Sequence, residues 1–113
     1  SISLIALADD SQAPGVFQAA ADLELSVPGD LSILGFGNQD HRSASALGLT
    51  TVEWPLKDMT EAAVSSIINV IEGRSPMTDV HPSASIDEDS ADGTPIATIP
   101  TRPVWRSSVA RRA

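Results

Sequence analysis

Hydrophobic residues in the first third of the chain change from a continuous run to helical spacing and back. Residues 2–8 form an almost uninterrupted apolar run, as expected for a β-strand covered on both faces. The next apolar residues recur on one face of a helix: Ala13, Val16, Phe17, Ala20 and Leu23. A Pro-Gly turn at 27–30 then leads to a second apolar run at 31–36. This order predicts a βαβ unit, whose two strands are parallel and joined by a right-handed crossover.

The middle of the chain repeats this pattern with less regularity. Residues 41–48 are small and polar, and they predict either a short helix or a loop closed by Gly48. A third strand is expected at 49–54. The strongest helical pattern covers 56–72 and stops at Gly73. Its apolar residues lie on one side of the helix: Met59, Ala63, Ile67, Val70 and Ile71.

The last third of the chain is less regular. Residues 75–95 are rich in Pro, Ser and Asp, include five acidic residues and offer little to bury. They predict a flexible acidic loop. The tail at 96–113 can form an extended strand, although Pro100 and Pro103 restrict it to the edge of a sheet or to a strap across the domain.

Composition then limits the classes of function. A chain of 113 residues, with 42% hydrophobic and 4% aromatic residues, forms one domain or part of one around a modest aliphatic core. Its formal net charge of -8 argues against binding nucleic acid by itself, because such binding depends on Lys and Arg at phosphates. Without cysteine, disulfides and thiolate metal sites are excluded. No apolar run approaches the roughly 18 residues of a membrane span.

The pattern gives little support to a dinucleotide loop, a hydrolase site or a metal site. Gly35 and Gly37 follow a strand, as the glycines of a dinucleotide-binding loop do, but Asp40 stands where that loop needs a small residue. A backbone with positive φ at Gly37 is the simpler explanation for the glycine at this position. His41 or His81 could act as the base of a hydrolase, but the sequence has no G-x-S-x-G motif to supply the serine nucleophile. Neither histidine has a ligand partner three or four residues away on a predicted helix, so neither a metal nor a cofactor is expected. Both histidines are expected to be solvated in acidic loops.

A binding site is better supported at the shared ends of the first two strands. Asp9 and Asp10 follow the first strand, and Gly37 and Asn38 follow the second. The carboxyl edge of an open parallel sheet is where ligands bind. For Asp10, the alternative is that its side chain only caps the following helix.

These residues carry a specific family resemblance. The stretch "ALADDSQAPGVFQAAADLELSVPGDLSILGFGN" is similar to the lactose repressor (LacI/GalR) family, which usually has A-x-N-D-x-x-A-x-G, a helix, and then V-P-x-D-[VI]-S-[VI]-[VI]-G-[FY]-D-[DN]. The first motif is filled by Asp10, Ala13 and Gly15. The second is filled by Val27, Pro28, Asp30, Ser32, Gly35, Phe36 and Asn38. Downstream, "LTTVEWPLKDMTEAAVSSIINVIEG" and "VWRSSV" also resemble family segments, whereas residues 79–94 resemble an insertion.

The resemblance implies a bacterial transcription regulator with a helix-turn-helix head and a two-lobed effector domain. This chain would be the last part of that domain, without the DNA-binding head. The implied fold is α/β, with three layers: a mostly parallel sheet flanked by helices, as in a lobe of a periplasmic binding protein. Small sugars or nucleosides would bind between the lobes, residues 13–24 and 40–48 would contribute to a homodimer, and the protein would be cytoplasmic and not an enzyme.

The departures from the family motifs change the expected site. Asp9 stands where the family often has a ligand-contacting Asn, and Gly37 stands where it usually has an Asp that holds effector hydroxyls or amines. Trp54 replaces a common Gln, and its indole could stack on a sugar or lie partly buried in an interface. We therefore expect a pocket unlike that of the usual sugar repressor. Its candidate ligand-binding residues are Asp9, Asp10, Gly37, Asn38 and Trp54.

Three alternatives remain open. A periplasmic sugar-binding protein of a transporter would share the fold, although the motifs resemble the repressor branch more closely. An enzyme built on a flavodoxin-like or hydrolase sheet is less favoured, since no nucleophile is identified. The chain could also be a truncated product without a function of its own.

Overall fold

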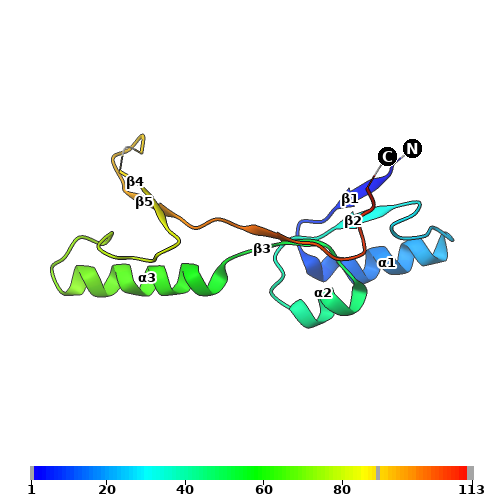
Figure 1. Cartoon of the computed structure of the whole chain (residues 1–113), viewed down its shortest axis with the longest axis horizontal. Helices are drawn as coiled ribbons and strands as arrows, with labels where there is room; N and C mark the ends of the chain where they lie inside the picture. Colours follow the sequence, from blue (N-terminus) through cyan, green and yellow to red (C-terminus); the bar gives the residue numbers. More distant parts are fainter. Residues whose placement is uncertain (1, 89, 112–113) are drawn as a thin grey trace. The chain divides into compact units, whose positions relative to one another are not determined.

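The two apolar runs at the start of the chain form neighbouring strands, β1 (Leu4–Ala6) and β2 (Ser32–Leu34), in the computed structural model of the protein (Figure 1). The structure describes residues 2–88 and 90–111. The two strands are parallel, with Ile5 opposite Ile33. The predicted parallel pair is therefore confirmed.

The connection between these strands begins with the polar residues that follow β1. Asp9 caps the short 3-10 helix η1 (Asp10–Gln12), because its carboxylate accepts a hydrogen bond of 2.8 Å from Ser11 N. The main helix α1 (Ala13–Asp22) continues from it, and Pro14 lies in its first turn, where the missing N–H has no partner to lose. Leu23 is the one residue of the predicted apolar face that is not buried or half-buried. It lies beyond the end of the helix and is 70% exposed.

A second helix and two further strands follow β2. Helix α2 (His41–Leu47) ends at Gly48, whose φ of 67° is a conformation that glycine adopts without strain. Strand β3 (Thr51–Glu53) is joined to the end of β2 by parallel bridges from Leu34 to Thr50 and from Gly37 to Glu53. Strand β6 (Arg102–Val104) pairs antiparallel with β3. Within the described residues β6 has no second neighbouring strand, as its proline predicts.

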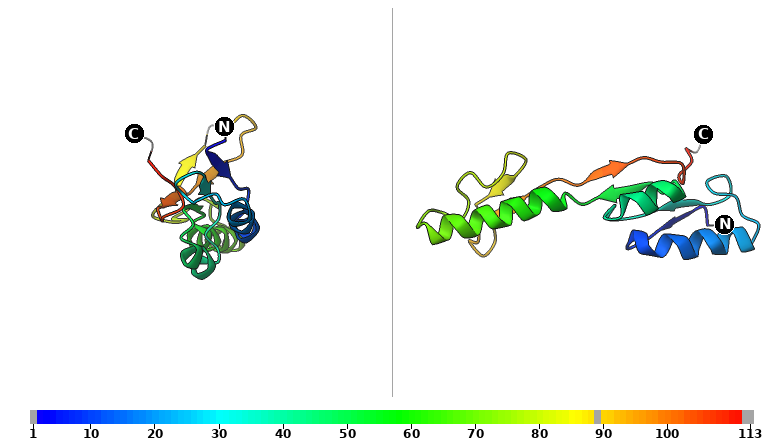
Figure 2. Two further views of the ribbon diagram at one scale, coloured as in Figure 1. Left: turned by 90° about the vertical axis from the view of Figure 1, so that its right-hand side faces the viewer. Right: turned by 90° about the horizontal axis from the view of Figure 1, so that it is seen from below.

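The core of this part of the chain is small and aliphatic. Its buried members are Ala13, Ala20, Leu31, Ile33, Ala44 and Leu49. Ile33 and Leu49 are completely buried, and each such side chain stabilises the fold by roughly 1.5–3 kcal/mol. Helices α1 and α2 lie on the same side of the strands (Figures 1 and 2). The expectation that β1 is covered on both faces is wrong for the described residues: Leu4 is 48% exposed, because no helix lies on its face.

The C-terminal segment fastens the ends of β2 and β3. Ser108 is 1% exposed, and its hydroxyl donates to Ile33 O at 2.5 Å and accepts from Thr50 N at 2.8 Å. The Arg106 guanidinium donates to Leu49 O at 2.7 Å. These contacts give a structural reason for the R-x-S pattern near the end of the sequence, because each side chain satisfies backbone groups that the strands leave unpaired.

Residues Pro55–Thr101 form a second compact unit, separate from the unit formed by Ser1–Trp54 with Arg102–Ala113. It contains α3 (Leu56–Ile71) and an antiparallel hairpin of β4 (Ser85–Asp87) and β5 (Ile96–Thr98).

The helix of the second unit ends near Gly73, as predicted. The side on which the sequence places its apolar residues is not the buried side. The buried residues of α3 are Ala62 and Asn69, whereas most of the predicted apolar side, including Ile67 and Ile71, is exposed. The Asn69 amide is buried because it donates to Thr78 O at 2.6 Å and accepts from the Arg74 guanidinium at 2.8 Å.

The segment predicted to be a flexible acidic loop, residues 75–95, is more regular than the sequence indicates. It contains β4, and Val80 is only 5% exposed. The structure as a whole is mixed α/β with small sheets of two strands, three of them among the described residues. None of the described helices is long and apolar enough to cross a membrane.

Candidate functional site

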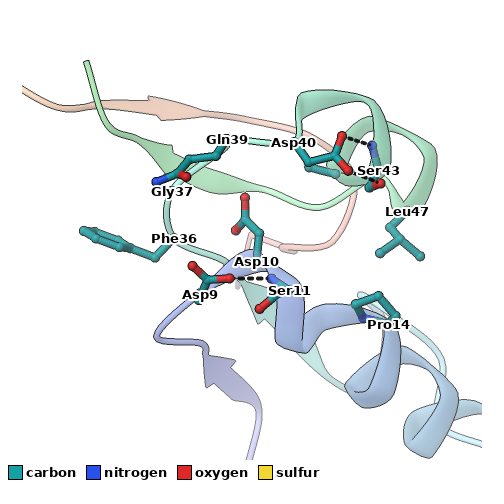
Figure 3. A pocket seen from close by; sticks show the side chains of 11 residues that line it. Asp9, Asp10, Ser11, Pro14, Phe36, Gly37, Gln39, Asp40, Ser43 and Leu47 are labelled. Atoms are coloured by element: carbon teal, nitrogen blue, oxygen red, sulfur yellow. Dashed lines mark hydrogen bonds between the residues drawn. The ribbon is translucent and has the colours of Figure 1, made fainter. Parts of the chain in front are cut away.

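A cavity of about 250 Å³ lies beside the carboxyl ends of β1 and β2. Three segments form its wall: the turn into α1, the segment after β2, and one face of α2 (Figure 3). The lining residues are Asp9, Asp10, Ser11, Pro14, Phe36, Gly37, Gln39, Asp40, Ser43, Ala44 and Leu47. The cavity therefore occupies the edge at which the sequence predicts a ligand.

Two of the acids in this wall are helix caps as well as lining residues. Interaction with the side chain and then the backbone of Ser11 lowers the pKa of Asp9. Asp40 caps α2 by accepting from Ser43 N at 3.2 Å and Ser43 Oγ at 2.6 Å, and these interactions lower the pKa of Asp40. Both carboxylates are therefore ionised at neutral pH and can accept hydrogen bonds from hydroxyl or amine groups of a ligand.

Asp10 connects three strand ends. Its Oδ1 accepts from Thr51 Oγ1 at 2.7 Å, and its Oδ2 accepts from Asn38 N at 2.8 Å. Figure 3 shows its carboxylate pointing from η1 toward the segment that follows β2. Gly35 makes room for this contact, since a Cβ at that position would lie 2.1 Å from Asp10 Oδ1. Asp10 thus shapes the cavity through structural hydrogen bonds, and the residue that caps the helix is Asp9.

Gly37 forms part of the cavity wall through its backbone. Its φ of 121° is one that residues with side chains rarely adopt. Its N–H donates to Val52 O at 2.7 Å, and its carbonyl accepts from Trp54 N at 3.2 Å. Both polar groups of Gly37 are therefore used to pair with β3.

Asn38 lies behind the cavity rather than in its lining. Only 9% of the residue is exposed, and its amide donates to Glu53 Oε2 at 2.6 Å and accepts from Arg106 Nη2 at 3.1 Å. Glu53 also forms an ion pair with Arg102 at 2.9 Å. The hydrogen bond from Asn38, followed by that from Arg102, lowers the pKa of Glu53.

Trp54 lies one contact away from the cavity. Its ring meets that of Phe36 edge to face, with centroids 5.6 Å apart and planes at 79°. Phe36 lines the cavity, whereas Trp54 is 38% exposed outside it. The structure thus brings Asp9, Asp10 and Gly37 together and places Asn38 and Trp54 next to them.

Several lining residues were not predicted from the sequence. Ser11, Gln39 and Ser43 carry no motif of their own. Asp40 and Ser43 do have the three-residue spacing of a helix cap, which could have identified the start of α2 at the cavity.

The two histidines lie in different units. His41 begins α2 and is exposed, as expected. His81 is not solvated as predicted: its side chain is only 13% exposed and lies beside Asp58 and Glu61 of α3.

Comparison with known proteins identifies the family. Residues 3–109 match the model of the periplasmic binding protein-like domain. The chain belongs to this family. Among curated proteins, the domain is 37% identical over 70 residues to the HTH-type transcriptional regulator MalR of Clostridium butyricum, covering 62% of this chain and 21% of that protein. It is 31% identical over 87 residues to the HTH-type transcriptional repressor PurR of Pectobacterium atrosepticum, covering 74% of this chain and 26% of that protein.

Solved structures give the same result for this periplasmic binding protein-like domain. A LacI-family transcriptional regulator from Burkhoderia phymatum is 27% identical, with a TM-score of 0.67 over 98% of this chain and 34% of the other. An Enterococcus faecalis LacI-family regulator with bound ribose shares the fold at 20% identity, with a TM-score of 0.65 over 96% of this chain and 34% of the other. A dimeric Lac repressor also shares the fold, at 17% identity and with a TM-score of 0.69. The match covers 95% of this chain and 33% of the other.

The periplasmic binding protein-like domain thus matches the effector-binding region of LacI-family transcriptional regulators. These relatives are regulators rather than enzymes. The chain spans about a quarter of the length of the curated relatives and a third of the matched structures.

Proposed function

We propose that this chain is the C-terminal portion of the effector-binding domain of a bacterial regulator, and that it senses a small sugar- or nucleoside-like molecule. The observation that supports this most directly is the cavity at the carboxyl ends of β1 and β2, since ligands of open parallel sheets bind there. In the intact protein, the strands of this chain would join a mostly parallel sheet with helices on both faces. Operator DNA would be bound by a separate head domain, in the cytoplasm.

The ligand contacts follow from the groups that remain available in the cavity. Asp9 uses one carboxylate oxygen to cap η1, which leaves acceptor capacity for a ligand hydroxyl. Gln39 is exposed and can both donate and accept hydrogen bonds. Phe36 offers an aromatic face that Trp54 supports from the side. Asp10 and Asn38 would act by positioning these groups, because their own polar atoms are already paired.

Regulation would require that the effector bind one conformation of the intact protein more tightly than another. The intact protein would be a homodimer, to which residues 13–24 and 40–48 contribute. Sedimentation velocity of the intact protein tests this part: a monomer at all concentrations would remove it from the proposal.

A thermal-unfolding screen tests the binding function. We expect D-ribose or another member of a panel of neutral sugars and nucleosides to stabilise the protein, by about 2.7 kcal/mol at a ligand concentration of 100 times its dissociation constant. Replacing Asp9→Asn keeps a good helix cap but removes the charge, so it should change the affinity while leaving the ligand-free stability nearly unchanged.

The matched control is Asp30→Asn. Asp30 is an exposed carboxylate that binds Ser26 in the turn before β2, away from the cavity lining. A panel in which no compound changes the unfolding temperature, or in which both substitutions alter affinity equally, would be evidence against an effector site at this cavity.

A further inference from the structure

A histidine and two carboxylates meet in the second unit, on residues with no part in the proposed effector site. Asp58 and Glu61 lie three positions apart on α3, so their side chains extend from the same face of the helix. His81 follows the buried Val80, which anchors this part of the loop. The imidazole Nε2 lies 3.6 Å from Asp58 Oδ1 and 3.4 Å from Glu61 Oε2.

These separations are those of atoms that share an ion. Ligand atoms bound at 2.0–2.2 Å to Zn²⁺ in tetrahedral geometry are about 3.4 Å apart. A direct N–H···O hydrogen bond is shorter, at about 2.7–3.2 Å. The three ligand atoms all lie within 4.8 Å of one another, so a single cation can contact all of them after small side-chain adjustments.

We propose that Asp58, Glu61 and His81 bind one divalent transition-metal ion of the Zn²⁺ type. One imidazole and two carboxylates suit Zn²⁺, whereas Mg²⁺ and Ca²⁺ prefer ligand sets made only of oxygen. Three protein ligands leave the fourth tetrahedral position to water. The ion joins the loop after α3 to the helix itself, so its role is to stabilise this unit.

The immediate surroundings leave the metal-facing atoms accessible. Lys57 Nζ lies 3.7 Å from Glu61 Oε1, which is the carboxylate oxygen that does not face His81. Both side chains of that pair are more than half exposed, so it contributes little and competes weakly with a cation. The His81 side chain is largely buried, which limits the rotamer freedom that it loses on binding.

The second nitrogen of His81 supplies a specific signature of metal binding. His81 Nδ1 accepts a hydrogen bond of 3.1 Å from Ser83 N. A neutral imidazole that binds a metal through Nε2 carries its proton on Nδ1. Metal binding therefore turns His81 Nδ1 from a hydrogen-bond acceptor into a donor. Nδ1 can then no longer accept the hydrogen bond from Ser83 N–H. The lost hydrogen bond lowers the affinity, and the change is visible at the Ser83 amide.

Calorimetric titration of the metal-free full chain with ZnCl₂ tests the proposal. We expect saturation at one ion per chain, no competition from an equal concentration of MgCl₂, and a chemical-shift change of the Ser83 amide in ¹H–¹⁵N spectra. Glu61→Gln keeps the shape of an exposed side chain and should weaken Zn²⁺ binding at least tenfold. His81→Gln should weaken it by at least as much.

The chain's other histidine provides the control. His41→Gln removes an exposed imidazole from α2 and should leave the Zn²⁺ titration unchanged. Circular dichroism establishes whether each variant is folded. If the His81→Gln variant does not fold, the Glu61→Gln variant decides the test. Unsaturable binding, equal affinity in Glu61→Gln and the original chain, equal weakening by His41→Gln, or an unaffected Ser83 amide would each overturn the assignment.

Discussion

At the scale of single residues, the close approach of Gly35 to Asp10 leaves no room for a side chain. Gly35→Ala would place a Cβ 2.1 Å from Asp10 Oδ1 and 2.8 Å from Leu49 Cδ2. The carboxylate is held by Thr51 and Asn38, so it cannot move away without breaking hydrogen bonds. We expect a loss of roughly 1–3 kcal/mol in the free energy of unfolding, measured by urea denaturation.

Gly15→Ala is the matched control for this substitution. A Cβ there has no neighbour within 4 Å, and the residue lies in α1, where alanine is favoured over glycine. We expect unchanged or slightly higher stability, by up to about 1 kcal/mol. A Gly35→Ala protein as stable as the original would show that Asp10 is not confined as the structure indicates.

Glu53 gives the pH dependence of the strand ends. Hydrogen bonds from Asn38 and then Arg102 lower the pKa of Glu53 below its ordinary value of 4.5. Because the folded-state pKa is the lower one, the stabilisation is complete above pH 4.5 and is lost as the pH falls through the folded-state value. Unfolding curves collected from neutral to acid pH should therefore show a loss of stability below about 4.5.

Replacing Glu53→Gln should reduce this acid-dependent loss, because the glutamine cannot ionise. Arg102 then loses its charged partner, so the variant should also be less stable at neutral pH. An identical acid profile in the Glu53→Gln variant would contradict this role of Glu53.

At the scale of elements, one buried hydroxyl helps to hold the C-terminal segment against the ends of β2 and β3. Ser108→Ala leaves Ile33 O and Thr50 N without their partner. A buried polar group that loses its hydrogen bond costs roughly 1–3 kcal/mol, which should appear in the free energy of unfolding. Ser107→Ala is the control, since Ser107 is exposed and its hydroxyl lies 3.4 Å from Gly48 O. Comparable effects of the two substitutions would exclude this role of Ser108.

Helix α3 shows what an element's sequence leaves undecided. Its length and its stop at Gly73 follow from local pattern, whereas its buried face does not. Asn69 is buried because Thr78 and Arg74 satisfy its amide, and those partners lie beyond the helix. Apolar periodicity alone would have chosen Ile67 and Ile71, which the structure exposes.

At the scale of the whole molecule, the negative charge determines what the chain does not bind. With a formal net charge of -8, it should be repelled by DNA phosphates. We expect no change in the fluorescence anisotropy of a labelled duplex at low salt, whereas a lysine-rich peptide should raise it. Binding that weakens as salt is added would instead indicate a basic surface on this chain, and would remove the need for a separate DNA-binding head.

Much of the candidate site could be predicted from the sequence, because the residues of the site directly follow strands. Asp9, Asp10 and Gly37 are found at one edge, as expected from two parallel strands whose carboxyl ends coincide. The contacts of Asn38 could not be predicted in the same way, because its amide bonds to Arg106, 68 positions away. The cluster around His81 could not be predicted from local spacing, because its two acids lie on α3, 20 or more positions before the histidine.

The sequence by itself determined the main strands and helices up to Gly73, the parallel pairing of the first two strands and the family. These depend on local quantities: apolar periodicity, capping side chains, and glycine or proline at the ends of elements. The tertiary structure alone decided which face of α3 is buried, which carboxylates keep free oxygens, and how Arg106 and Ser108 fasten the strand ends. Those outcomes depend on satisfying buried polar groups with partners distant in sequence, and no local pattern specifies such partners.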